Sequence, residues 1–257
     1  MATRAQLIAA LVLASAAANA SGLVGLYEFN NPNNLGLDSS GLGNNLQVIG
    51  TGVSSGAGEF GGGLNLTDQG GLTTAGGNVP LQFPLGNTSY TISVWFDSPL
   101  GSPNNGGFIG WGAYNNTDEV TALRLNGNGF RQYWWGNDLD WADPLNTIYD
   151  VWNNVTVSFD GTTRKIYFNG TLEISDTPGG HNAQSGNFDI GVTNFNEYFH
   201  GTLDNVAVFN EALTAQQVST IEGGNFSEFG VAATPEPGTM GLLMGAGLLL
   251  AGIRRRK

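Results

Sequence analysis

The sequence predicts an all-β protein, an antiparallel β-sandwich of the jelly-roll kind, flanked by a signal peptide and a short C-terminal transmembrane helix. Short segments that alternate apolar and polar residues recur along the chain, which is the period of a half-buried strand. The 40 glycines follow no collagen-like repeat and so indicate many tight turns. Asn169-Gly170 lies between two such segments, and Asn-Gly is a strong signal for a two-residue hairpin turn.

Eight segments carry the strand pattern, with β-branched or aromatic residues between turn-forming ones. They are 22–29, 90–96, 120–125, 130–135, 152–159, 164–168, 187–192 and 202–209, and a further strand over 171–174 follows the Asn169-Gly170 turn. Only one helix is expected, where Thr214 and Gln217 form a capping box ahead of two apolar residues. No longer period recurs, so the sequence does not favour a propeller or a solenoid.

The charge of the chain excludes nucleic acid as a partner. Between residues 21 and 235 there are 20 acidic residues and four basic ones, a formal charge of −16. Such a surface repels phosphate backbones and attracts divalent cations. The chain has no cysteine, which excludes disulfides, thiolate zinc sites and cysteine nucleophiles. An exported protein without disulfides must be held together by packing, hydrogen bonds or a metal.

Residues 1–20 have the pattern of a signal peptide and predict export. Arg4 supplies the positive charge, residues 7–18 form an apolar run, and Ala18-Asn19-Ala20 is a small-x-small cleavage site. The apolar run is too short to span a bilayer. A short N-terminal helix of the fold is the alternative, but the order of the three parts favours cleavage by signal peptidase before Ser21.

The segment 231–257 predicts a membrane anchor or sorting tail. An uncharged run of sixteen residues from Gly238 is slightly short for a membrane helix. The basic cluster after it stays cytoplasmic, so the body faces outward. The residues that define the tail are Pro235, Glu236 and Pro237 before the apolar run, and Arg254, Arg255, Arg256 and Lys257 after it.

This order of residues resembles the PEP-CTERM sorting signal of Gram-negative bacteria, which the membrane protease exosortase reads. The resemblance implies a transient membrane anchor, cleavage near residues 235–237, and transfer to the cell surface or extracellular matrix. The alternative is an ordinary single-pass anchor.

The segment between the two ends, 21–230, is expected to form one domain. Its motifs are Leu23-Val24-Gly25-Leu26-Tyr27-Glu28-Phe29, Asp38-Ser39-Ser40-Gly41-Leu42-Gly43-Asn44, Phe60-Gly61-Gly62-Gly63-Leu64, Tyr90-Thr91-Ile92-Ser93-Val94-Trp95-Phe96, the pair 152–161 and 166–170, and the closing stretch 201–214. In this order they resemble the laminin-G-like, concanavalin A-like lectin/glucanase domain of bacterial surface proteins. The resemblance implies a two-sheet sandwich that binds carbohydrate.

The same resemblance implies a structural calcium ion. In relatives of this fold an aspartate at the start of the last strand commonly joins oxygens of an early loop, which implicates Asp204. Asp38 and Asn44 in the early Gly-rich loop are the candidates for the other ligands, because calcium takes carboxylate, amide and carbonyl oxygens. The alternative is that Asp38 and Asn44 cap a turn through hydrogen bonds to the backbone.

An aromatic segment is the candidate carbohydrate-binding site. Alternation puts Tyr133 and Trp135 on one face of their strand and Trp134 on the other, so at least one large aromatic is exposed or covered by a loop. Asp138 follows closely and is included as a polar contact. Since large aromatics in a sandwich usually belong to the core, core packing is the alternative for each of them.

Three aspartates form the one candidate catalytic constellation: Asp138, Asp140 and Asp143. They resemble the acid pair of family 16 glycoside hydrolases only partly, because aspartates replace both glutamates and the flanking residues are typical of loops. Neither His181 nor His200 lies in a nucleophile or zinc motif. The sequence therefore predicts a surface binding module rather than an enzyme. A structural matrix protein without a ligand, and a divergent hydrolase, are the alternatives.

Overall fold

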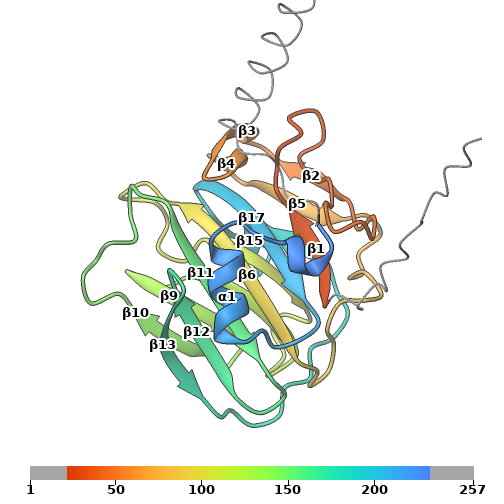
Figure 1. Cartoon of the computed structure of the whole chain (residues 1–257), viewed down its shortest axis with the longest axis vertical. Helices are drawn as coiled ribbons and strands as arrows, with labels where there is room; N and C mark the ends of the chain where they lie inside the picture. The colour runs from red at the N-terminus through yellow and green to blue at the C-terminus, as the bar shows by residue number, and fades with distance from the viewer. Residues whose placement is uncertain (1–21, 232–257) are drawn as a thin grey trace, which may run out of the picture.

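Two β-sheets stack face to face in the computed structural model, which describes residues 22–231 (Figure 1). The first sheet has eight strands in the order β13 (Thr171–Asp176), β12 (Arg164–Phe168), β11 (Asn153–Phe159), β6 (Tyr90–Asp97), β17 (Gly201–Phe209), β4 (Gly61–Leu66) and β3 (Val53–Gly58), with β1 (Leu23–Tyr27) paired to β17. Every strand pair in this sheet is antiparallel.

The second sheet has nine strands. Their order is β10 (Leu139–Ala142), β9 (Gly129–Tyr133), β8 (Val120–Leu125), β7 (Gly107–Gly112), β14 (Asp189–Ile190), β5 (Gly70–Thr74) and β2 (Leu46–Gly50), with the short β15 (Val192–Thr193) and β16 (Glu197–Tyr198) beside β7. The pairs are antiparallel except for a single parallel bridge between β16 and β7. The predicted antiparallel sandwich is thus confirmed.

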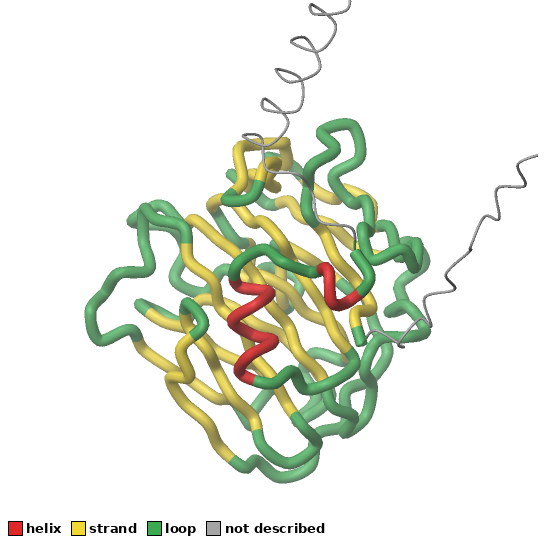
Figure 2. The backbone as a smooth tube through the Cα atoms, in the orientation of Figure 1, coloured by secondary structure: helices red, strands yellow, loops and turns green. Residues whose placement is uncertain are grey.

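The core lies between the two sheets and is rich in aromatic rings. Phe96 from the first sheet contacts Phe108 and Phe130 from the second, with ring centroids 4.9 and 5.6 Å apart. All three side chains are fully buried. The tube view in Figure 2 shows strands over most of the body, with loops gathered at the ends of the sheets. Side chains on the inner faces are therefore committed to packing, and surface chemistry belongs to the outer faces and the loops.

Most of the predicted strands are present. The ranges 120–125 and 164–168 coincide with β8 and β12, and the Asn169-Gly170 turn joins β12 to β13 with φ of 46° and 73°. The expected strand over 187–192 is interrupted at Gly191, where φ is 85°, and becomes the separate strands β14 and β15. The expected strand over 130–135 ends at Tyr133.

Six strands had not been predicted from alternation in the sequence. Four of them, β3, β4, β5 and β7, are rich in glycine, and the other two are β2 and the edge strand β10. Gly107 and Gly110 illustrate why glycine occurs in β7, because a Cβ at either position would lie within 2.4 Å of Thr193 or of the Tyr114 hydroxyl. Close backbone approach therefore replaces side-chain packing in this part of the second sheet.

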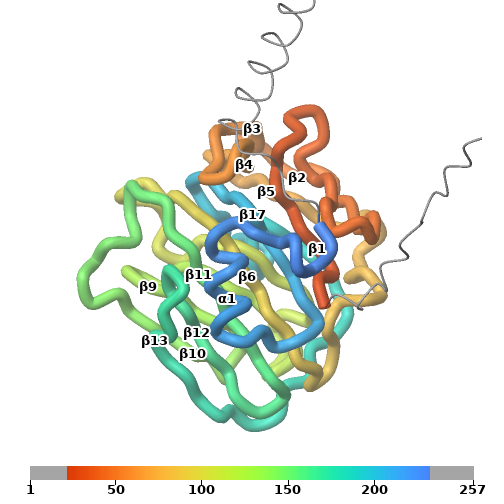
Figure 3. The backbone as a smooth tube through the Cα atoms, viewed as in Figure 1, coloured from red at the N-terminus to blue at the C-terminus, as the bar shows by residue number. Residues whose placement is uncertain are grey.

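The only helices in residues 22–231 cover the outer face of the first sheet (Figure 3). Helix α1 (Ala215–Glu222) begins at the predicted capping box, with Thr214 accepting from the backbone of Gln217, and the 3-10 helix η1 (Ser227–Phe229) follows it. Val218, Ile221 and Phe229 pack with residues of β1 and β17 in a second apolar cluster. These helices thus cover part of that outer face, whereas no helix in residues 22–231 covers the outer face of the nine-stranded sheet.

The predicted signal peptide and sorting tail lie outside the described residues. These include Pro235, Glu236, Pro237, Arg254, Arg255 and Arg256. Within residues 22–231, no helix is long and apolar enough to cross a membrane.

Candidate functional site

The outer face of the nine-stranded sheet carries an aromatic patch. Tyr133 is the last residue of β9, and Trp135 follows the strand with φ of 62°; their ring centroids are 5.6 Å apart, and Tyr133 is 6.2 Å from Tyr114. Phe195, in the turn between β15 and β16, contacts Tyr114 at 5.4 Å. The four rings of Tyr114, Tyr133, Trp135 and Phe195 are called the aromatic patch below.

Phe195 is the most exposed ring of the patch, with 67% of its surface accessible. Its φ is 62°, a backbone conformation that is rare for a bulky residue, and Asn194 before it has φ of 45°. Such strain is typical of functional sites, where the rest of the structure holds it in place. Phe195 could not be predicted from the sequence, because a single aromatic in an Asn-rich turn forms no pattern.

Trp134 does not belong to the patch. Its side chain is fully buried in the core and stacks on His181 at 3.9 Å with nearly parallel rings. The Arg164 guanidinium lies 4.1 Å from the same ring, and the Trp134 indole N–H donates to the Tyr90 hydroxyl at 2.9 Å. No surface of Trp134 is left for a sugar, so it is removed from the candidate binding residues. Core packing, the alternative, describes it.

Charged side chains border the aromatic patch. Arg124 lies 5.2 Å from the Tyr133 ring and 3.5 Å from a carboxylate oxygen of Glu197. Burial raises the pKa of Tyr133 to about 12, with a further contribution from the negative charge of Glu197, so its hydroxyl stays protonated. Tyr114, Tyr133 and Arg124 are themselves buried, so Phe195 and the partly buried Trp135 are the rings of the patch that face solvent.

Arg131 joins two of the three predicted acidic residues. It contacts Asp138 at 3.3 Å and Asp140 at 2.7 Å. Asp138 also accepts from the backbone N–H of Trp134 at 2.9 Å. Asp143 is buried and accepts from the backbone N–H of Leu145 at 2.9 Å and from the Thr147 hydroxyl at 3.0 Å.

This arrangement does not resemble a retaining acid pair. A pair of that kind needs one protonated and one ionised carboxyl facing each other across a sugar bond. Here Asp138 and Asp140 both form ion pairs with one guanidinium, and Asp143 accepts the hydrogen bonds of a turn. Asp140 lies on strand β10, and Asp143 follows that strand. From the sequence, the residues on both sides of this segment had been expected to form loops.

The three predicted calcium ligands divide into two groups. Asp38 accepts four hydrogen bonds, from the backbone of Leu26, Ser40 and Asn44 and from the Ser40 hydroxyl, at 2.8 to 3.1 Å. The Asn44 side chain donates to the carbonyl of Val24 at 2.8 Å. These bonds are those of the turn-capping alternative, and they leave the Asp38 carboxylate with little capacity for a metal.

Asp204 lies in the first half of β17, beneath the turn between β3 and β4. Its carboxylate accepts from the backbone of Phe60 at 2.8 Å and of Asn205 at 2.7 Å. Burial, together with the nearby charge of Glu28, raises the pKa of Asp204 to about 7. Among residues 22–231, no three His, Asp or Glu side chains gather in a group that could hold a metal ion. Asp38 and Asn44 therefore make the contacts of a capped turn, and the Asp204 carboxylate is held by separate backbone groups.

Fold and outer face together define a lectin-type β-sandwich. Residues 67–219 match the concanavalin A-like lectin/glucanases superfamily, and the chain belongs to this family. Residues 233–257 match the PEP-CTERM protein-sorting motif, which indicates an exported protein that is sorted to the cell surface. No curated protein sequence matches the chain.

Solved structures share the fold at low sequence identity. Domain 4 of AbnA, a GH43 extracellular arabinanase from Geobacillus stearothermophilus, in complex with arabinotriose, is 22% identical with a TM-score of 0.61, and the match covers 78% of this chain and 98% of that domain. The binding domain of Paraclostridial Mosquitocidal Protein 1 is 15% identical with a TM-score of 0.59, covering 79% and 52%. The receptor binding domain of botulinum neurotoxin D is also 15% identical, with a TM-score of 0.57, covering 79% and 53%. The chain thus spans about half of the toxin domains.

Proposed function

We propose that the protein is a surface-associated binding module that recognises carbohydrate through the aromatic patch. The observation that carries this proposal is the exposed ring of Phe195, together with the partly exposed Trp135 and the buried Tyr133, on an outer sheet face that no helix covers. An aromatic ring offers a flat apolar face, while hydroxyl and charged groups at its edge fix the orientation of a ligand. A sugar ring combines the same two kinds of surface.

The residues around the patch supply the polar contacts. Arg124 lies beside the Tyr133 ring, and Arg131 forms an ion pair with Asp138. We propose Asp138 as one of these polar contacts. The arabinotriose bound by the similar arabinanase domain supports a saccharide as the ligand class.

We infer that the domain binds its ligand without hydrolysing it. Three carboxylates that serve an arginine and a turn offer no general acid. The toxin structures that share the fold are binding domains of their proteins. A transient membrane anchor, cleaved by an exosortase-type protease, would then leave the module at the surface or in the extracellular matrix of a Gram-negative cell.

Calcium is proposed at Asp204 alone among the three predicted ligands. Its carboxylate is fully buried, Glu28 lies close enough to raise its pKa, and backbone groups of residues 59 and 60 surround it. A divalent cation would offset the repulsion between the two carboxylates. Its role would be structural.

A glycan array probed with the full chain tests the proposal. The wild type is expected to retain a defined set of glycans that Trp135→Ala and Phe195→Ala lose. Leu81→Ala, which truncates a fully exposed apolar side chain outside the patch, is the matched control. If no glycan is retained above background, the structural matrix protein is the correct reading. Release of reducing ends from β-glucan, lost in Asp138→Asn, would instead establish a hydrolase.

A further inference from the structure

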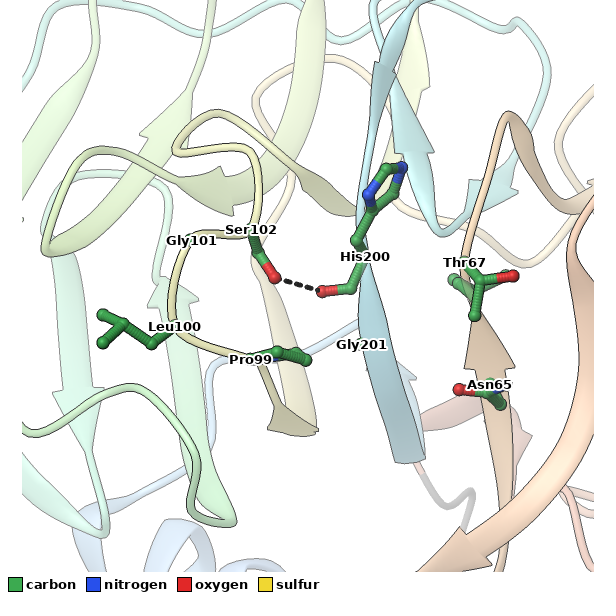
Figure 4. Close-up of a pocket in the computed structure, with 9 residues that line it drawn as sticks. Asn65, Thr67, Pro99, Leu100, Gly101, Ser102, His200 and Gly201 are labelled. Atoms are coloured by element: carbon green, nitrogen blue, oxygen red, sulfur yellow. Dashed lines mark hydrogen bonds between the residues drawn. The ribbon is translucent and has the colours of Figure 1, made fainter.

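Two surface cavities meet at His200, outside the aromatic patch. The larger has a volume of about 340 Å³ and lies between Asn65, Thr67 and the loop 99–102. The smaller, of about 190 Å³, lies beside it, and His200 lines both. Figure 4 shows His200 between this loop on one side and the strand with Asn65 and Thr67 on the other. A few hundred Å³ is the usual size of a ligand pocket.

Hydrogen-bonding side chains that the protein itself does not use line mainly the smaller cavity, and His200 is the one that both cavities share. Five of the side chains that line the cavities make no hydrogen bond within the residues that the structure describes. They are Gln69, Asn105, Asn196, Tyr198 and His200. Ser102 donates to the backbone carbonyl of His200 at 3.2 Å, which fixes the loop against β17. Amide, phenol and imidazole groups each donate and accept, and so match a ligand that is rich in hydroxyl groups.

The charge of the lining narrows the class of ligand. Neither cavity is lined by a lysine or an arginine, and Asp68 is the only carboxylate, which accepts from the Thr51 hydroxyl at 2.8 Å. A phosphate, sulfate or uronate would meet no fixed positive charge here. Pro99 and the largely exposed Leu100 add an apolar side to the larger cavity. A neutral sugar satisfies both conditions.

The turn between β15 and β16 connects the cavities to the aromatic patch. Phe195 contacts Tyr114 in the patch, while Asn196 and Tyr198 line the smaller cavity. Three residues of chain reach at most about 11 Å, so the two areas are close neighbours. One linear polymer of a few sugar units can therefore contact both.

We propose that the cavities at His200 form a second sugar subsite, continuous with the aromatic patch across the β15–β16 turn, which selects an extended neutral polysaccharide. This inference rests on the proposed function, since it extends the same ligand along the surface.

Nuclear magnetic resonance of the ¹⁵N-labelled full chain tests it, with cellohexaose, xylohexaose and mannohexaose as probes. At least one probe is expected to shift the side-chain amide signals of Asn105, Asn196 and Gln69 saturably, together with signals of the patch. His200→Ala and Asn105→Ala are expected to weaken binding about tenfold each, the scale of one or two lost hydrogen bonds. Gln216→Ala, an exposed glutamine on α1, is the control and leaves binding unchanged.

Each outcome is decisive. Shifts in both areas, reduced by His200→Ala, support the subsite. Shifts confined to the aromatic patch, with His200→Ala binding as tightly as the wild type, overturn the subsite and leave the proposed function in place. Absence of shifts in both areas with all three probes overturns both proposals.

Discussion

The Arg164 guanidinium lies 4.1 Å from the ring centroid of Trp134, over the ring. His181 stacks on the same ring at 3.9 Å, so the indole is held between a cation and an imidazole. Arg164 also binds Asp176 at 2.7 Å and the carbonyl of Asn137 at 2.7 Å, which satisfies a charge whose side chain is fully buried. A tryptophan next in sequence to a surface aromatic is thus the centre of a buried polar stack.

Trp134→Ala is expected to destabilise the protein, because it leaves a cavity and removes the surface on which Arg164 and His181 rest. A loss of about 3–5 kcal/mol in the free energy of unfolding is typical for a buried tryptophan. Trp135→Ala is expected to cost less than about 1 kcal/mol, since that ring is partly exposed. Urea unfolding of both variants measures the difference, and equal losses would contradict the separation of core from patch.

His181 makes stability depend on acid. Burial lowers the pKa of His181 from 6.5 to about 4, with help from the positive charge of Arg164. Between pH 6.5 and 4 the unfolded chain binds a proton that the folded protein does not, so the free energy of unfolding falls as the pH falls. We expect this contribution to be on the order of 3 kcal/mol.

His181→Gln lacks this titrating group, so its free energy of unfolding should depend less on pH than that of the wild type. His200→Gln should not have this effect. The imidazole proton signals of His181, followed by resonance spectroscopy, are expected to titrate near pH 4. A titration midpoint near 6.5 would show that the ring is hydrated and that the stack is open.

Asp204 changes the pH dependence of the free energy of unfolding in the opposite direction to His181. Its pKa is raised to about 7, so between pH 4 and 7 the folded protein keeps a proton that the unfolded chain has released. The free energy of unfolding therefore falls as the pH rises through this range, and Asp204→Asn is expected to remove that slope. Because His181 contributes a slope of the other sign, only the two variants separate the contributions.

Calcium is expected to reverse the effect of Asp204 above pH 7. A bound ion needs the ionised carboxylate and should raise the melting temperature of the wild type by roughly 5 °C. Asp204→Asn is expected to lose this response, and Asp38→Asn to keep it while melting lower, since Asp38 holds a turn. A melting temperature unchanged by chelator in the wild type would reject the calcium proposal.

The hairpin turn at Gly170 provides a test of the backbone. Its φ is 73° and a Cβ there would meet nothing closer than 3.6 Å, so the cost of Gly170→Ala is conformational rather than steric. A loss of about 1 kcal/mol or more is expected. Gly179→Ala is the control, because Gly179 has open space around it and no left-handed backbone. Comparable losses in the two variants would show that the turn conformation does not matter.

Most of the fold could be predicted from the sequence, because alternation and turn chemistry are local signals. Tyr90 to Phe96 alternate, Asn169-Gly170 turns, and Thr214 caps a helix, and the structure contains all three. Strands β3, β4 and β7 could not be predicted in this way. Their glycines are explained by neighbours distant in sequence, such as Thr193 opposite Gly107.

The candidate site was predictable only in part. Alternation predicted Tyr133 and Trp135 on one face of their strand, but it did not indicate which face of the strand packs against the other sheet. Phe195 and Tyr114 join the patch through tertiary contact alone. In the sequence, Asp38 is compatible both with a metal ligand and with a residue that caps a turn. Only its four hydrogen bonds in the structure distinguish the two interpretations.

The affinity of the full chain for the best glycan of the array, measured by calorimetry, tests the role of the aromatic patch most directly. Trp135→Ala is expected to bind at least about tenfold more weakly than the wild type, while Leu81→Ala is expected to bind equally well. Equal affinities for all three proteins would contradict it, because the glycan would then bind elsewhere on the sandwich.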